Sequence, residues 1–169
     1  WDVKRQKFIP HIYPEKSPIP EGFDELAIHY HGGTAIAIEA GLLSEDEIRT
    51  VNAQMLENVR LSGMPSIGLT LYPVYPDGFF HGGMSKAYLY QNGGDWTWFG
   101  GRMIQQLVVN GMVEEAYAEI HPMIERVIQN DGFYEWYGKG GVPSGSGNFK
   151  GSAGGLSKAI ELLRDWAEK

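Results

Sequence analysis

The sequence predicts an all-α fold built from helical hairpins, and three observations support this. Apolar residues recur at helical spacing, glycines follow the ends of these apolar segments, and the pattern of a Gly-Gly start followed by helices is repeated along the chain. A Gly-Gly start followed by two helices occurs at Gly32 to Val59 and at Gly93 to Ile128, and it begins again at Gly151 to Trp166. We therefore expect five or six helices stacked as hairpins. Strands should be short and confined to Ile67–Tyr90 and the region near Phe133.

Length and composition indicate one domain, residues 1–169. With 43% hydrophobic and 21% charged residues the chain has the composition of a globular protein. No apolar run approaches the roughly 20 residues of a membrane-spanning helix, so we expect no membrane partner. A net charge of −7 with scattered basic residues argues against nucleic acid. The chain has no cysteine, and the sequence does not choose between a cytoplasmic and an exported protein.

The first 25 residues predict an extended arm that is not an independent unit, because four prolines interrupt any helical period. A short helix is expected over Thr34–Ala40, with Gly41 closing it in a left-handed conformation. The capping-box pattern Ser44-Glu45-Asp46-Glu47 then starts a second helix, expected over Glu45–Ser62 and ended by Gly63.

Three more helices are expected downstream. One follows Asp95 and stops at Asn110-Gly111, and the next covers Val113–Gln129, with a kink expected at Pro122. Apolar residues from Leu156 to Trp166 predict a last amphipathic helix.

Two segments combine aromatic residues with glycines: YQNGGDWTWFGG at Tyr90–Gly101 and GFYEWYGKGGVPSGSGNFKGSAG at Gly132–Gly154. Such a mixture builds a poor core but suits a wet, aromatic-lined cleft. Aromatic faces stack on sugar rings, amides and carboxylates bond to hydroxyls, and glycines let the backbone approach a ligand. The hairpin repeat gathers the glycine-rich segments at one end of the fold. The sequence thus predicts a carbohydrate site formed by both segments.

YQNGGDWTWFGG resembles the Asn-Gly-Gly-x-Trp-x-Trp loop of the six-hairpin glycosidase superfamily. The second segment is similar to the Phe-x-Glu-x-Tyr … Gly-Ser … Phe-x-x-Ser-Ala pattern near the carboxyl end of several of these (α/α)6 toroids, among them neutral invertases, trehalases and processing α-glucosidases. The resemblance implies hydrolysis with inversion of a carbohydrate substrate, without a metal or cofactor. It makes Glu135 the candidate general base. The sugar subsite would be lined by Asn92, Trp96, Trp98, Tyr134 and Trp136.

The chain also departs from that family. A toroid needs about twelve helices, so the sequence predicts a partial toroid, associated either with a second copy or with a missing half. Inverting chemistry requires two carboxyls roughly 6.5 to 9.5 Å apart. Asp95 is the candidate partner of Glu135, although a helix cap is the favoured interpretation of its position.

Other interpretations remain open. Glu135 is either a catalytic base or a carboxylate satisfied by the glycine loop. The domain is either a glycosidase, a phosphorylase of the same fold, or a noncatalytic carbohydrate-binding or assembly module. His29 and His31 would form a metal site only with further ligands nearby, and a structural role is the favoured interpretation.

Overall fold

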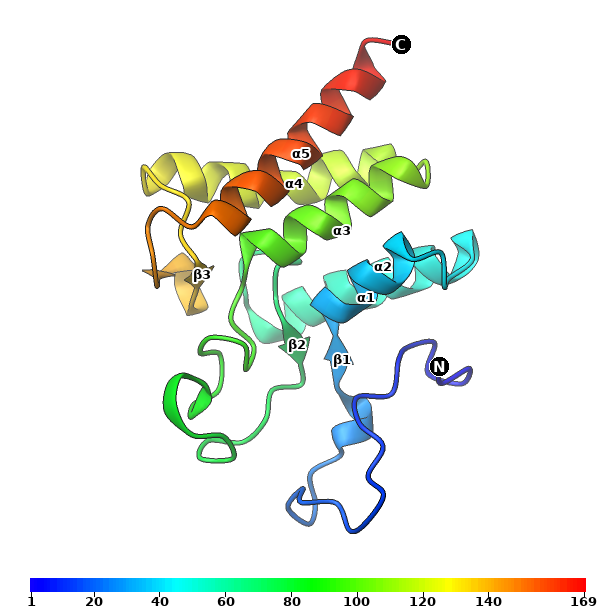
Figure 1. The fold of residues 1–169 in the computed structure, drawn as a ribbon, viewed down its shortest axis with the longest axis vertical. Coiled ribbons are helices and arrows are strands. Elements are labelled where there is room, and N and C mark those ends of the chain that lie inside the picture. The colour runs from blue at the N-terminus through cyan, green and yellow to red at the C-terminus, as the bar shows by residue number, and fades with distance from the viewer.

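The computed structural model describes all residues, 1–169, and consists mainly of five α-helices (Figure 1). The helices are α1 (His31–Glu39), α2 (Glu45–Ser62), α3 (Thr97–Val109), α4 (Val113–Gln129) and α5 (Lys150–Ala167). Two small antiparallel sheets pair β1 (His29–Tyr30) with β2 (Leu71–Tyr72) and β3 (Trp136–Tyr137) with β4 (Pro143–Ser144). Short 3₁₀ turns lie at Glu25–Ala27, Gly82–Met84 and Lys139–Gly141. None of the helices combines the length and apolar character needed to span a membrane.

Local signals set the ends of α2. The Ser44 hydroxyl accepts a hydrogen bond from the Glu47 amide, at 3.4 Å, and Glu47 Oε2 accepts from the Ser44 amide at 2.8 Å. This confirms the predicted capping box, in which two otherwise unpaired amides are satisfied. Gly63 ends the helix at φ 68°, in the left-handed region that favours glycine.

The bounds of α4 agree with those predicted, and Pro122 lies inside the helix without ending it. Two other helices begin earlier than expected. α1 starts at His31, before the Gly-Gly pair, and α5 starts at Lys150, so Gly151, Gly154 and Gly155 are helical residues. A Cβ added at Gly32 would meet Phe99, and one added at Gly155 would meet the Trp98 backbone, so close packing offsets the low helix propensity of glycine at these two positions.

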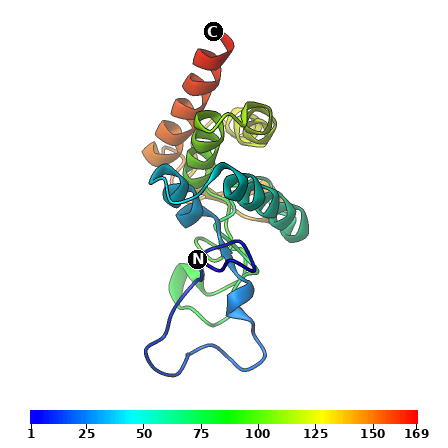
Figure 2. The same cartoon turned by 90° about the vertical axis from the view of Figure 1, so that its right-hand side faces the viewer.

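The main core lies around α3, which packs against α1, α4 and α5 (Figures 1 and 2). A Cβ added to Gly101 of α3 would lie only 2.7 Å from the Gly155 carbonyl carbon of α5. The absence of side chains therefore lets these two helices cross with their backbones in contact. The buried core side chains of α3 are Met103, Ile104 and Leu107.

The N-terminal arm is extended, and it is held by contacts with Glu25. Tyr13 donates to the Glu25 carboxylate at 2.9 Å, and Tyr75 donates to it at 2.6 Å. Tyr75 also packs with Ile28 and Leu71 in a second, smaller apolar cluster. The arm and the loop that follows β2 therefore form one unit below the helices (Figure 1).

The helices make an open stack rather than a closed ring (Figures 1 and 2). The number of helices agrees with the predicted five or six. The predicted confinement of strands to Ile67–Tyr90 and the region near Phe133 is wrong, because β1 at His29–Tyr30 pairs with β2. The toroid that the resemblance implies stays a prediction.

Candidate functional site

A continuous series of aromatic rings joins the two glycine-rich segments. Trp136 lies 6.3 Å from Tyr90, and Tyr90 lies 5.0 Å from Trp96, measured between ring centroids. Phe99 lies 5.8 Å from Trp96 and 4.8 Å from Trp98. The predicted juxtaposition of the two segments is confirmed by these contacts.

The main chain holds the segments together at Asp95 and Tyr137. The Asp95 amide donates to the Tyr137 carbonyl at 2.9 Å, and the Tyr137 amide donates back at 2.8 Å. This bridge ties the start of α3 to β3, so the Trp98 side of the site and the Glu135 side are fixed relative to each other.

The Asp95 side chain is fully buried and forms an internal ion pair. Its Oδ1 lies 2.7 Å from Arg126 Nη1, and its Oδ2 accepts a hydrogen bond from the Ser66 hydroxyl at 2.7 Å. Burial raises the pKa of the Asp95 carboxyl, while Arg126 and Ser66 oppose this rise. The expected helix cap is wrong, because Trp96 is the N-cap residue of α3 and no side chain caps that end.

Asn92 and Trp96 are also buried, and both shape the loop. Asn92 forms a two-way bridge to Tyr75, accepting from its amide at 2.9 Å and donating to its carbonyl at 3.2 Å. Trp96 is 3% exposed, and its indole N–H donates to the Tyr90 carbonyl at 3.2 Å. Neither side chain presents an open stacking or bonding surface to a ligand.

The other sequence-predicted residues remain reachable. Trp98, Tyr134, Glu135 and Trp136 are each partly exposed. Tyr134 is anchored through its carbonyl, which accepts from the Ser152 hydroxyl of α5 at 2.9 Å. The structure thus divides the predicted site into buried supports and exposed candidates for ligand contact.

Glu135 directly precedes β3 and is held by the segment between β4 and α5. Its amide donates to the Ser146 carbonyl at 2.9 Å, and its Oε2 accepts from the Ser146 amide at 3.3 Å. The side chain packs over Gly145, which has a φ of 71° and no room for a Cβ. Oε1 receives no hydrogen bond from the protein, so Glu135 is oriented by one oxygen and keeps the other free.

Trp98 also lines a cavity of about 330 Å³ between α3 and α5. Arg102 lies beside the indole, with its guanidinium carbon 5.5 Å from the ring centre, and pairs with Glu39 at 2.9 Å. Gln105, Lys150 and Lys158 complete its polar wall. Sequence reasoning missed these residues, although Trp98, Arg102 and Gln105 follow helical spacing that places them on one face.

A smaller cavity of about 120 Å³ lies on the Phe99 side. Its lining includes Tyr30 from β1, Thr70 and Gln91, together with Gly33 of α1. Because Trp98 and Phe99 are neighbours with rings in contact, the two cavities adjoin the same aromatic pair.

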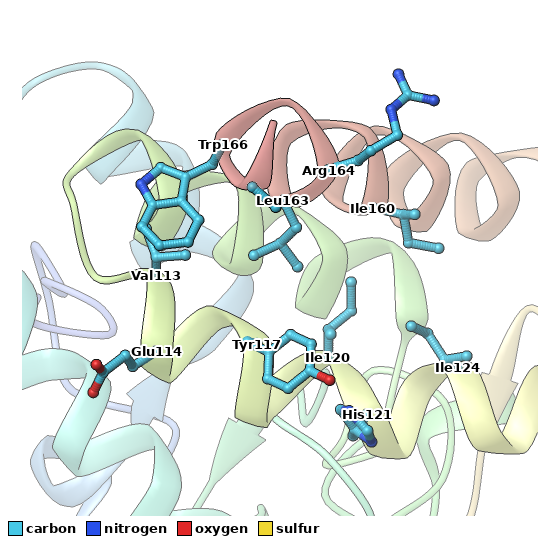
Figure 3. A pocket seen from close by; sticks show the side chains of 11 residues that line it. Val113, Glu114, Tyr117, Ile120, His121, Ile124, Ile160, Leu163, Arg164 and Trp166 are labelled. Atoms are coloured by element: carbon cyan, nitrogen blue, oxygen red, sulfur yellow. The ribbon is translucent and has the colours of Figure 1, made fainter. Parts of the chain in front are cut away.

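An apolar groove lies elsewhere, between α4 and the carboxyl-terminal half of α5 (Figure 3). Its volume is about 570 Å³, and Tyr117, Ile160, Leu163 and Trp166 are among its lining residues. Few polar groups converge there, so we place the candidate site at the aromatic segments rather than in this larger groove.

His29 and His31 are both buried, with ring centroids 5.1 Å apart. Thr34 Oγ1 lies 3.4 Å from His29 Nε2, and Asn58 Nδ2 lies 3.1 Å from His31 Nε2. No group of three or more His, Asp or Glu residues is arranged to hold a metal ion.

No protein-family model matches the chain, and a search of curated proteins finds no relative.

Proposed function

We propose that the aromatic segments bind carbohydrate and that the chain acts in its hydrolysis with inversion. Glu135 is the general base that takes the proton of the attacking water, and a carboxylic acid from a second copy or from the missing half of the toroid protonates the leaving oxygen. The observation that carries this proposal is the hydrogen bonding of the Glu135 carboxylate. Glu135 stands between Tyr134 and Trp136 in the sequence. One of its carboxylate oxygens accepts a hydrogen bond from the Ser146 amide, and the other oxygen is unpaired. A base must be oriented and must also keep an oxygen for the proton that it accepts.

Trp98 would provide the stacking surface for a sugar. It is partly exposed and lies at the end of the aromatic series, next to a cavity with amide and charged groups. Aromatic rings bind the apolar face of a sugar, while polar side chains bond to its hydroxyls.

A noncatalytic carbohydrate-binding module is the second candidate, and the burial of Asp95 favours it. Inversion needs a carboxylic acid opposite the base. Asp95, the candidate for that role, is instead fully buried and paired with Arg126. In this alternative the chain binds the sugar and does not cleave it.

A paired assay of binding and turnover separates the candidates. Nitrophenyl α- and β-glycosides and matching disaccharides would be tested on the wild type, Glu135→Gln and Trp98→Ala, with Trp1→Ala in the N-terminal arm as a control. We expect Glu135→Gln to lower turnover by roughly 10²- to 10⁴-fold while binding survives. Trp98→Ala should weaken binding through lost stacking area.

Each other outcome has a definite meaning. Binding without any turnover by the wild type supports the noncatalytic module. Turnover that Glu135→Gln leaves unchanged overturns the assignment of the base. Binding that falls as much in Trp1→Ala as in Trp98→Ala overturns the assignment of the stacking surface.

A further inference from the structure

The cavity beside Trp98 is rich in positive charge, although the protein is acidic. The chain has a net charge of −7, yet Arg102, Lys150 and Lys158 all line this cavity and Glu39 is its one carboxylate. A local excess of cations around an aromatic side chain points to a ligand that has both a ring and a negative charge.

The cations are available to such a ligand. The Lys150 side chain is exposed, and its ammonium group forms no ion pair or hydrogen bond within the protein. Arg102 pairs with Glu39 and Lys158 pairs with Glu161, but all four side chains are at least one-third exposed. Exposed ion pairs contribute little to stability, so their cations can turn to another anion at small cost.

Gly154 gives a second, independent observation. It is a helical residue of α5, a Cβ added to it would meet nothing within 4 Å, and it does not have a positive φ. Glycine inside a helix is less favourable than alanine, because its backbone loses more conformational freedom on folding. Gly155 differs, because its Cβ would lie 3.3 Å from the Trp98 carbonyl oxygen, where the helices pack closely. Packing thus explains Gly155 and does not explain Gly154.

Gly154 lies in the wall of the same cavity. A side chain there would project into open space, which is where a ligand over Trp98 and Lys150 would lie. The missing side chain therefore keeps the cavity open at a cost to the helix.

We propose that this cavity binds the anionic substituent of a sugar, a carboxylate, sulfate or phosphate group, while the sugar ring stacks on Trp98. Lys150 and Arg102 supply the positive charge, Gln105 supplies an amide, and Gly154 leaves the space. This inference rests on the proposed function, since it names the class of carbohydrate that the site takes.

The test is calorimetric titration of the full chain with glucuronate, glucose 6-sulfate, glucose 6-phosphate, uncharged glucose and inorganic phosphate. We expect at least one charged sugar to bind about tenfold more tightly than glucose, with an affinity that falls as salt is added. The charged sugar that binds most tightly identifies the substituent. Lys150→Gln should remove most of this preference, so that the affinity for the charged sugar falls towards that for glucose, and Lys16→Gln in the arm should behave as the wild type.

Gly154→Leu adds a readout that a structural role would not give. Because leucine favours the helix more than glycine does, the variant should unfold at equal or higher urea concentration. Its affinity for the charged sugar should nevertheless fall at least about tenfold, because the side chain fills the cavity. Ser157→Leu, on an exposed position of α5, is the control and should bind normally.

The outcomes separate this inference from the function on which it rests. Equal binding of charged and uncharged sugars, lost in Trp98→Ala, overturns the anionic subsite and leaves the carbohydrate site standing. Inorganic phosphate that binds as tightly as glucose 6-phosphate, with no effect of Trp98→Ala, shows a simple anion site and also overturns the inference. Absence of binding by every sugar overturns the carbohydrate site itself.

Discussion

Arg126 of α4 and Asp95 form a buried ion pair, with 2.7 Å between Nη1 and Oδ1. Their side chains are 5% and 0% exposed. The same guanidinium lies 4.2 Å from the centre of the Tyr137 ring and donates to the Thr97 hydroxyl at 2.7 Å. Arg126 therefore contacts residues on both sides of the bridge between the aromatic segments. The pair positions the segment of Trp98 against β3, which directly follows Glu135.

Arg126→Met should destabilise the protein strongly. The substitution keeps an apolar stem of similar length and leaves the Asp95 carboxylate buried without its cation, which typically costs about 3–5 kcal/mol. Urea unfolding measures this loss. Arg49→Met is the matched control, because the exposed Arg49–Glu115 pair, at 3.7 Å, should be worth no more than about 1 kcal/mol. Similar losses in the two variants would contradict a structural role for the buried pair.

Glu119→Gln should change how stability depends on pH. Burial raises the pKa of the Glu119 carboxyl to about 7. The Asn52 amide donates a hydrogen bond to this carboxyl at 2.7 Å, which partly opposes the rise. Because the folded state holds this proton more tightly than the unfolded chain, Glu119 favours folding below pH 4.5, and that contribution is lost as pH rises through about 7. The loss is on the order of 3 kcal/mol.

The measurement is urea unfolding of both proteins between pH 4.5 and 8. Glutamine keeps an acceptor for Asn52 and cannot ionise, so the variant should gain stability relative to the wild type as pH rises. Parallel pH profiles for the two proteins would show that Glu119 does not ionise differently on folding.

His29 should lower the stability of the protein as the pH falls, whereas Glu119 lowers it as the pH rises. Burial, followed by the nearby Lys7 charge, lowers the pKa of His29 to about 4 from an ordinary 6.5. The unfolded chain then binds the proton first, so the contribution of His29 to stability is present above pH 6.5 and is lost as pH falls towards 4. Burial also lowers the pKa of His31, so His31 should contribute to the same loss of stability at low pH.

His29→Gln should therefore lose less stability than the wild type when the pH is lowered from 7 to 4. The expected difference in slope reaches about 1.4 kcal/mol per pH unit for one proton. His81→Gln, in an exposed loop, is the control and should follow the wild type. A His29→Gln profile that also follows the wild type would contradict this prediction.

Association with a second copy of the chain is expected through the groove between α4 and α5. Tyr117 and Trp166 are 63% and 54% exposed in this apolar surface (Figure 3). Burying such side chains against another molecule removes apolar area from water. Sedimentation should show a dimer that Trp166→Glu converts to a monomer, whereas Trp1→Glu should not. A wild-type monomer at all concentrations would contradict the expected homodimer.

The sequence by itself determined the helices whose ends depend on neighbouring residues. The capping box fixed the start of α2, glycine fixed its end, and apolar periodicity marked α4 from Val113 to Gln129. These signals act through hydrogen bonds and side-chain spacing within one or two turns, so they can be recognised without the fold.

Only the tertiary structure decided which residues of the aromatic segments are supports and which are exposed. Asn92, Asp95 and Trp96 look as suited to a ligand as Trp98 and Glu135, but distant partners bury them: Tyr75 for Asn92, and Arg126 for Asp95. The cationic cavity likewise joins residues of α1, α3 and α5. Burial and long-range pairing depend on how the helices pack, and packing brings together residues whose local sequence patterns are independent of one another.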